Sequence, residues 1–392
     1  MVCGNRQCLQ HQQAAVHSPE FFPLQAIDEF LAGLADVRIV GRGDVAYRGP
    51  RSNAGATCGA ENAGMQNTLN RRQWCSLQAA LLAGLHRPVQ AAHDIAAAPQ
   101  DGVWSDSHRS RTVPWRLRLP TQPGPWPLVL YSHGLGGNRE GGAVWGQAWA
   151  EAGLAVLHLQ HPGSDSDTLR NGLAALRAAA SAEQLLARVH DVRFAIDEIE
   201  GLAQVGAEPW RSLRLDAIGL AGHSFGAQTT QAVAGQRYPV AASVADARLR
   251  AFIALSPSLP RNGPLTPVQS FGAIARPFMA ITGSLDGDPF GTFDGGASRA
   301  RVFDGLPPGQ RALLWLEGAD HMSFGGASAR RVPAVGPFKR HGPAAALQPA
   351  HQALVARVST LWWRTHLLAD ADARAALRQP LGLAEQDRFT ID

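Results

Sequence analysis

The sequence predicts an α/β fold in which a mostly parallel sheet is flanked by helices. From about residue 103 onward, short apolar or β-branched runs alternate with longer segments of helical periodicity, which is typical of repeated strand–helix–strand units. Several of the short runs are almost continuously apolar, as in strands that helices cover on both faces. The chain of 392 residues, with 45% apolar and 17% charged residues, can also bury a large core.

The apolar runs locate the strands, and the segments between them locate the helices. The first strand, 112–120, alternates polar and apolar residues and is expected to lie antiparallel at an edge of the sheet. Further strands are expected at 126–134, 154–163, 216–224, 249–257, 276–286 and 311–321. Helices are expected at 144–153, 172–203, 226–235 and 351–368. Gly- and Pro-rich stretches predict long loops at strand ends, at 258–275, 287–310 and 323–350.

The N-terminal quarter differs from the rest of the chain. Residues 1–64 show no sustained periodicity. From Met65 the sequence has the layout of a secretory signal peptide, with the pair Arg71-Arg72, a short apolar stretch and a small-residue site before Ala92. The alternative for this segment is an ordinary amphipathic helix. The apolar stretch is too short to span a bilayer permanently, which takes about 20 residues.

The paired arginines resemble a twin-arginine export signal. We therefore expect a bacterial protein that is periplasmic or secreted and whose biological start is Met65. In this organisation, residues 1–64 are a non-native, weakly structured extension, residues 65–91 are the signal peptide, and residues 92–392 form one catalytic domain.

Charge, cysteines and motifs exclude several classes of function. The net charge of +4 comes from scattered arginines with a single lysine, so no nucleic-acid partner is expected. All four cysteines lie within the first 75 residues, which excludes a disulfide framework or a cysteine-based zinc site from the catalytic domain. No H-E-x-x-H, dinucleotide or phosphate-loop motif occurs, so neither a metal nor a cofactor is expected. The two histidines of "HLQH" (158–161) would point to opposite faces of a strand.

A catalytic nucleophile is predicted at Ser224. The segment from Gly222 to Gly226, "GHSFG", matches G-x-S-x-G and lies between a predicted strand and a predicted helix. The turn between such elements is crowded, so the positions flanking the nucleophile must lack bulk, which the two glycines provide. The serine hydroxyl is then held above the sheet, at the positive end of the next helix.

The other catalytic groups are expected downstream, in the order acid and then histidine. His321, at the end of the last predicted strand, is the expected base, because a serine hydroxyl needs a base to act as a nucleophile. Asp286 is the expected acid, with Asp288 as the alternative. Asp320 is poorly placed to reach the ring of its neighbour His321 and is expected to cap or brace the loop.

An oxyanion hole is expected where "SHGLGG" (132–137) follows a buried strand. The predicted donors are the backbone N–H groups of Leu135 and Phe225. Two further histidines, His133 and His223, are expected to be structural. Trp145, Trp149 and Phe290 are candidates for lining the pocket, although core packing is an equal expectation for both tryptophans.

Five motifs in order resemble one enzyme family. The segments "YSHGLGGNREGG", "LHLQHPGSD", "AGHSFGAQT", "ITGSLDGD" and "EGADHMSFGG" are similar to bacterial α/β-hydrolases known as predicted dienelactone hydrolases, a branch close to the platelet-activating-factor acetylhydrolases. The similarity runs from about Val103 to the final helix. It implies an eight-stranded, mostly parallel sheet and a triad of Ser224, Asp286 and His321.

The chain differs from related enzymes at the nucleophile and at the oxyanion segment. Dienelactone hydrolases use a cysteine nucleophile, whereas this chain has Ser224, so the family label does not give the substrate. The oxyanion segment also differs from the Gly-Tyr type of cutinase-like polyester hydrolases. The resemblance to the bacterial α/β-hydrolases implies the oxyanion donors that the residues also predict, the N–H groups of Leu135 and Phe225.

The expected function is a serine ester hydrolase acting on carboxylic esters of short acyl groups, in small molecules or lipids, through an acyl-enzyme intermediate. The alternatives are a phospholipase A2-type acetylhydrolase acting on short-chain lipid esters and a polyester or aromatic-ester hydrolase. A non-enzymatic hydrolase-fold binding protein is disfavoured because every catalytic residue is present. The acyl and alcohol preferences depend on the loops at 164–183, 287–310 and 323–350.

Overall fold

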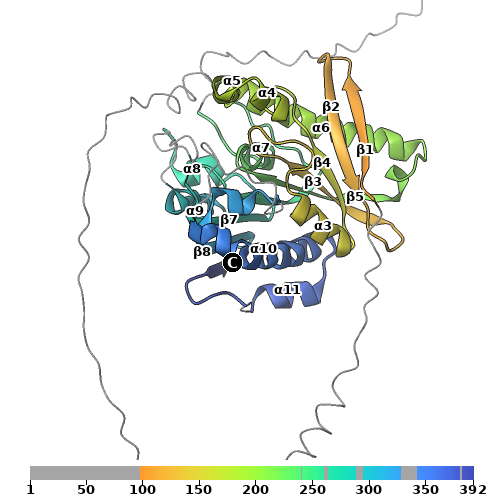
Figure 1. The fold of residues 1–392 in the computed structure, drawn as a ribbon. Coiled ribbons are helices and arrows are strands. Elements are labelled where there is room, and N and C mark those ends of the chain that lie inside the picture. The colour runs from red at the N-terminus through yellow and green to blue at the C-terminus, as the bar shows by residue number, and fades with distance from the viewer. Residues whose placement is uncertain (1–97, 240, 260–263, 288–294, 328–341, 380–381) are drawn as a thin grey trace, which may run out of the picture. The chain divides into compact units, whose positions relative to one another are not determined.

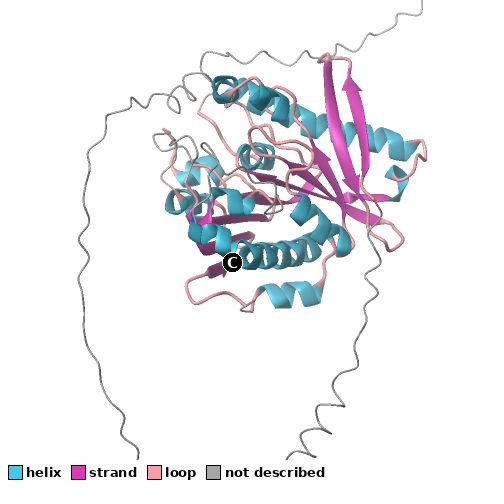
Figure 2. Ribbon diagram, viewed as in Figure 1, coloured by secondary structure: helices cyan, strands magenta, loops and turns pink. Residues whose placement is uncertain are grey.

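The computed structural model describes residues 98–239, 241–259, 264–287, 295–327, 342–379 and 382–392. Within these ranges, a nine-stranded, mostly parallel sheet is flanked by helices (Figures 1 and 2), which confirms the predicted α/β class. The predictions for residues 1–64 and 65–91, and those for Asp288 and Phe290, lie outside the described residues.

The strand order across the sheet is β1-β2-β4-β3-β5-β6-β7-β8-β9. The strands are β1 Gln100–Asp106, β2 Arg111–Arg118, β3 Trp126–Ser132, β4 Ala155–Leu159, β5 Leu213–His223, β6 Leu249–Leu255, β7 Phe278–Leu285, β8 Arg311–Asp320 and β9 Arg388–Ile391. Strands β4, β3, β5, β6, β7 and β8 pair in parallel. The pairs β1–β2, β2–β4 and β8–β9 are antiparallel.

Helices cover both faces of the sheet (Figure 1). The α-helices are α3 Ala143–Glu151, α4 Ser166–Arg170, α5 Leu173–Ala178, α6 Ala182–Gln204, α7 Phe225–Ala234, α8 Pro267–Phe271, α9 Gly296–Gly305, α10 Gly342–Leu367 and α11 Ala371–Leu377. Two 3₁₀ turns are η1 Trp210–Ser212 and η2 His321–Phe324. Buried side chains of α6, α7, α8 and α9 share one core cluster with the sheet, and those of α3, α10 and α11 share another.

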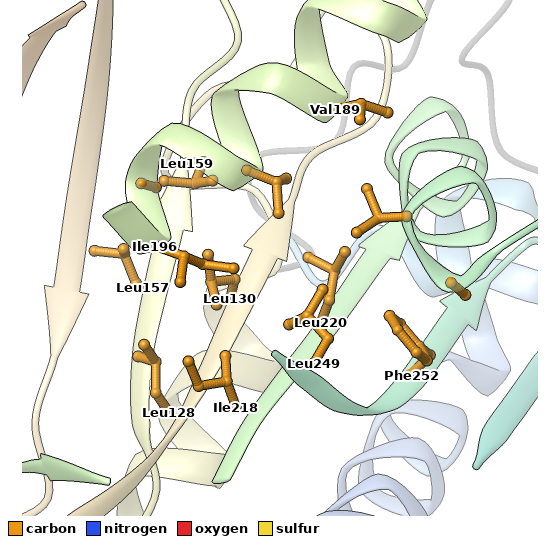
Figure 3. Close-up of a cluster of buried hydrophobic side chains, with 14 of the residues drawn as sticks. Leu128, Leu130, Leu157, Leu159, Val189, Ile196, Ile218, Leu220, Leu249 and Phe252 are labelled. Carbon is orange, nitrogen blue, oxygen red and sulfur yellow. The ribbon is translucent and has the colours of Figure 1, made fainter. Parts of the chain in front are cut away.

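The two cores explain why the parallel strands are continuously apolar. On one face, leucines of β3 and β4 and Ile218 of β5 pack beneath α6, whose Ile196 points toward them (Figure 3). On the other face, Trp149 of α3 meets Trp363 of α10 edge to face, with ring centroids 5.7 Å apart. Trp145 and Trp149 are fully buried in this second core, so both belong to the core and not to a pocket wall.

Several predicted boundaries are wrong. The sheet has nine described strands where eight were expected, and β1, not the segment 112–120, forms the edge of the sheet. The expected helix 172–203 is two helices, because Ser181 caps a new one by accepting a hydrogen bond from the backbone N–H of Gln184. The expected loops contain α8, α9 and the first turns of α10, where three successive alanines (344–346) favour helix.

Within the part of the chain that the structure describes, none of the helices has both the length and the apolar character that crossing a bilayer requires.

Candidate active site

The predicted triad residues each follow a parallel strand directly. Ser224 comes after β5, Asp286 after β7 and His321 after β8. The carboxyl ends of parallel strands meet at one edge of a sheet, and binding sites form where the strand order reverses. Here the order reverses at β3, since β4 lies on one side of it and β5 on the other.

The structure brings these three side chains together in one hydrogen-bonded chain. Nε2 of His321 lies 2.9 Å from Oγ of Ser224, and Nδ1 of His321 lies 2.8 Å from Oδ1 of Asp286. Since the carboxylate can only accept, the imidazole proton sits on Nδ1, and Nε2 is free to accept the serine proton. Ser224 is half-buried, His321 is buried, and Asp286 has no exposed surface.

The turn at Ser224 holds the serine in a strained conformation. Its φ is 56° and its ψ is −115°, a region that side chains other than glycine rarely adopt and that costs about 1–3 kcal/mol. The N–H of Ser224 donates to the carbonyl of Leu255 at 2.9 Å, which helps to hold this conformation. A Cβ at Gly222 would overlap the carbonyl oxygen of Gly226, and a Cβ at Gly226 would overlap that of Ser132.

Asp286 stays ionised because of its neighbours. Burial alone would raise its pKa, but the charge of Arg299 and the hydrogen bonds from His321 and Thr282 outweigh burial and lower the pKa to about 2. Nε of Arg299 lies 3.2 Å from Oδ1, and the hydroxyl of Thr282 donates to Oδ2 at 2.8 Å. The acid is therefore ionised near neutral pH.

Two residues beside the triad have structural roles, as expected. His223 donates from Nε2 to the carbonyl of His321 at 3.0 Å, and burial, with the neighbouring His321, lowers its pKa to about 3. Asp320 caps η2 by accepting from the N–H of Ser323 at 2.9 Å and from its hydroxyl at 2.8 Å. Both contacts hold the backbone that carries His321.

The predicted oxyanion donors lie on segments that border Ser224. Residues 133–137, called the oxyanion loop below, turn tightly: the N–H of Gly137 donates to the carbonyl of Gly134 at 3.0 Å. A Cβ at Gly134 would lie 3.4 Å from the Cβ of Ser224, so the loop passes directly beside the serine. Leu135 follows Gly134, and Phe225 is the first residue of α7, where an N–H has no acceptor within the helix.

His133 is also structural. Its Nε2 accepts from the N–H of His161 at 3.0 Å, so the proton sits on Nδ1, which donates to the carbonyl of Gly134 at 2.6 Å. Burial, together with the charge of Arg188, lowers its pKa well below the ordinary value, which keeps the ring neutral.

The charged residues that support the site were not predicted from the sequence. Arg299 lies in a stretch that was expected to be a loop, so no periodicity marked it as buried. Arg188 and Asp191 carry a signal that was available, because they are three residues apart on the face of α6 that also presents Val192 and Ala195 to the core. A charged residue at such a position is almost never buried without a partner.

No group of three or more His, Cys, Asp or Glu side chains among the described residues is arranged to hold a metal ion. His158 and His161 have different partners, the carbonyl of Gly141 and the carboxylate of Asp191.

No protein-family model matches the chain, and no curated protein matches it. What the site can do must therefore be read from its geometry.

Proposed function

We propose that this protein is a serine ester hydrolase with an α/β-hydrolase fold, which cleaves carboxylic esters of short acyl groups through an acyl-enzyme intermediate. The observation that carries the proposal is the chain from Ser224 Oγ through His321 to the buried carboxylate of Asp286, with distances of 2.9 and 2.8 Å. The resemblance of the surrounding motifs to bacterial α/β-hydrolases supports the same reaction class.

In the proposed reaction, Oγ of Ser224 attacks the ester carbonyl carbon while Nε2 of His321 takes the hydroxyl proton. Asp286 stabilises the resulting imidazolium. His321 then protonates the leaving alkoxide, and the acyl group remains on Ser224. A water molecule then attacks the acyl-enzyme while it gives a proton to His321. His321 returns this proton to Oγ of Ser224 as the carboxylic acid leaves, which restores the serine.

The N–H groups of Leu135 and Phe225 are the proposed donors to the oxyanion that forms on the carbonyl oxygen. Each donor of this kind lowers the barrier by about 3 kcal/mol when it is fixed in advance. Both groups belong to the backbone, so substitution of either side chain leaves the donor in place. The donors must therefore be tested through the residues that hold the loop.

The first test is Ser224→Ala, measured with p-nitrophenyl acetate and butyrate and with a fluorophosphonate probe. We expect wild-type enzyme to hydrolyse both esters and to be labelled stoichiometrically. The variant should lose about 10⁴-fold or more in kcat and all labelling, with an unchanged circular dichroism spectrum.

Ser110→Ala is the matched control, since Ser110 also has a positive φ, 48°, but is exposed in the turn between β1 and β2. It should keep full activity and labelling. A Ser224→Ala enzyme that hydrolyses esters at the wild-type rate would refute the proposal. The same assay with longer acyl chains and with a short-chain phospholipid decides between a general esterase and a lipid acetylhydrolase.

A further inference from the structure

A second Ser–His–Asp arrangement lies behind the oxyanion loop. Oγ of Ser132 is 2.9 Å from Nε2 of His161, and Nδ1 of His161 is 3.0 Å from Oδ2 of Asp191. The order of atoms is the same as at Ser224. All three side chains are fully buried, however, so no substrate reaches Ser132 and the arrangement is not a second catalytic site.

Charge and burial together hold the protonation state of this Ser132–His161–Asp191 chain, called the buried relay below. Asp191 accepts from Nη1 of Arg109 at 2.9 Å and from Nε and Nη2 of Arg111 at 2.7 and 2.8 Å. Burial, more than any other influence, lowers the pKa of His161 to about 4. His161 is thus neutral near pH 7: its Nδ1 carries the proton and donates to Asp191, and its Nε2 accepts from the hydroxyl of Ser132.

The relay connects to one peptide unit of the oxyanion loop. The N–H of His161 donates to Nε2 of His133, and Nδ1 of His133 donates to the carbonyl of Gly134. That carbonyl also accepts from the N–H of Gly137. The carbonyl of Gly134 and the N–H of Leu135 belong to the same trans peptide, so they point in opposite directions. Two donors that hold the oxygen therefore also fix the direction of the proposed oxyanion donor.

Arg188 of α6 contacts both segments that carry the proposed oxyanion donors, namely the oxyanion loop and the start of α7. Its Nη1 donates to the carbonyl of His133 at 2.6 Å, and its Nε donates to Oγ of Ser164 at 2.8 Å. The carbonyl of Ser164 accepts both from Nη2 of Arg188, at 3.2 Å, and from the N–H of Gly136, at 3.0 Å. The guanidinium also lies 4.4 Å from the centroid of the Phe225 ring.

We propose that Arg188 and the buried relay of Ser132, His161 and Asp191 are positioning residues of the oxyanion hole. They hold the Gly134–Leu135 peptide with its N–H toward the serine and keep Phe225 beside it. The inference rests on the proposed ester hydrolase function. Because an oxyanion donor acts only when it is fixed in advance, a displacement of about 1 Å costs up to about 100-fold in rate.

The test compares Arg188→Met, Arg188→Lys and Ser132→Ala with wild type. Each enzyme is assayed for kcat and KM per fluorophosphonate-titrated site, and for inhibition by an alkyl trifluoromethyl ketone, which forms a tetrahedral oxyanion on Ser224. We expect kcat to fall about 10- to 100-fold in Arg188→Met and about tenfold in Ser132→Ala, with KM within about threefold of wild type. Affinity for the ketone should fall in parallel with kcat/KM.

Two further variants separate positioning from stability. Arg188→Lys should recover part of kcat, because an ammonium group can still donate to the carbonyl of His133. Leu249→Ala creates a cavity at the start of β6, where Leu249 is fully buried, and should lower the melting temperature without changing kcat per titrated site. If Arg188→Met does not fold, Ser132→Ala decides, since it removes a single hydroxyl.

The proposal is overturned if Ser132→Ala and folded Arg188→Met keep the wild-type kcat per titrated site and the wild-type affinity for the ketone. It is also overturned if they lose only melting temperature, as Leu249→Ala does. Wild-type enzyme and Ser224→Ala are assayed together with these variants. A wild type that neither hydrolyses esters nor reacts with the probe would refute the ester hydrolase function and this inference together, whereas an active wild type beside unchanged variants would refute the inference alone.

Discussion

Asp286 supports the proposed chemistry through His321, whose Nδ1 lies 2.8 Å from its carboxylate. It is fully buried, and its charge is balanced by Arg299 and by hydrogen bonds from His321 and Thr282. A buried carboxylate without such partners would be protonated or would destabilise the fold. Its ionisation is therefore a property of three separate segments of the chain and not of Asp286 alone.

Asp286→Asn is expected to lower kcat by about 10⁴-fold with little change in KM, because an amide can neither hold the imidazole tautomer nor stabilise the imidazolium. Asp288→Asn, which changes the other acid that the sequence offers, should keep kcat near the wild-type value. Steady-state kinetics on p-nitrophenyl acetate decides. The reverse result would move the role of the acid to Asp288.

At this scale the sequence predicted the hydrogen-bonded trio but not its support. Ser224 and His321 could be named because the glycines around one and the strand before the other are local signals. Arg188 and Asp191 could be recognised as charged residues on the apolar face of α6, but their partners, such as His133 and Arg111, lie far away in the chain. Arg299 lies in a stretch that was expected to be a loop, so its burial against Asp286 could not be predicted. Their positions depend on how α6 and α9 pack, which no local motif encodes.

At the scale of elements, the junction of β3, β5 and α7 sets the site. Gly222 and Gly226 let the end of β5, the start of α7 and the end of β3 approach within van der Waals contact. The sequence predicted this junction because its strands are long and apolar. It missed β1 and β9, since β1 contains glycine and aspartates and β9 has only four residues. Peripheral strands such as these bury little surface and so carry a weak hydrophobic pattern.

Gly226→Ala should lower the free energy of unfolding by about 3 kcal/mol and reduce kcat, because the new methyl group would overlap the carbonyl of Ser132 and push the oxyanion loop away from α7. The matched control is Gly201→Ala in α6, where a Cβ meets nothing within 4 Å. That change should stabilise the protein by about 0.5–1 kcal/mol. Urea titrations of both variants give the comparison, and a stabilised Gly226→Ala enzyme would contradict the close packing of this junction.

At the scale of the whole domain, neutral histidines are built into the interior. His133, His158, His161 and His223 are all buried, and burial is the largest cause of the lowered pKa in each case. The pKa is lowered to about 3 for His158 and His223 and to about 4 for His161. In the unfolded chain the same side chains take up protons near pH 6.5.

This difference makes the fold sensitive to acid. Above about pH 7.5 neither state binds these protons, so the stability is fully present. Below pH 6.5 the unfolded state binds up to four more protons than the folded state, and the free energy of unfolding falls by up to about 5 kcal/mol per pH unit until the native histidines titrate. A typical domain has only about 5–15 kcal/mol in total. We therefore expect the domain to unfold between about pH 5.5 and pH 4.

Urea unfolding followed by circular dichroism at intervals from pH 8 to pH 5 measures this dependence. The free energy of unfolding should be nearly constant from pH 8 to pH 7 and should then fall with increasing slope. His158→Asn tests one member of the set, since an amide can replace the Nδ1 donor to the carbonyl of Gly141 without titrating. It should reduce the slope below pH 6 by about 1.4 kcal/mol per pH unit. A stability that stays flat down to pH 5 would mean that the buried rings accept protons without cost, in conflict with the packing around them.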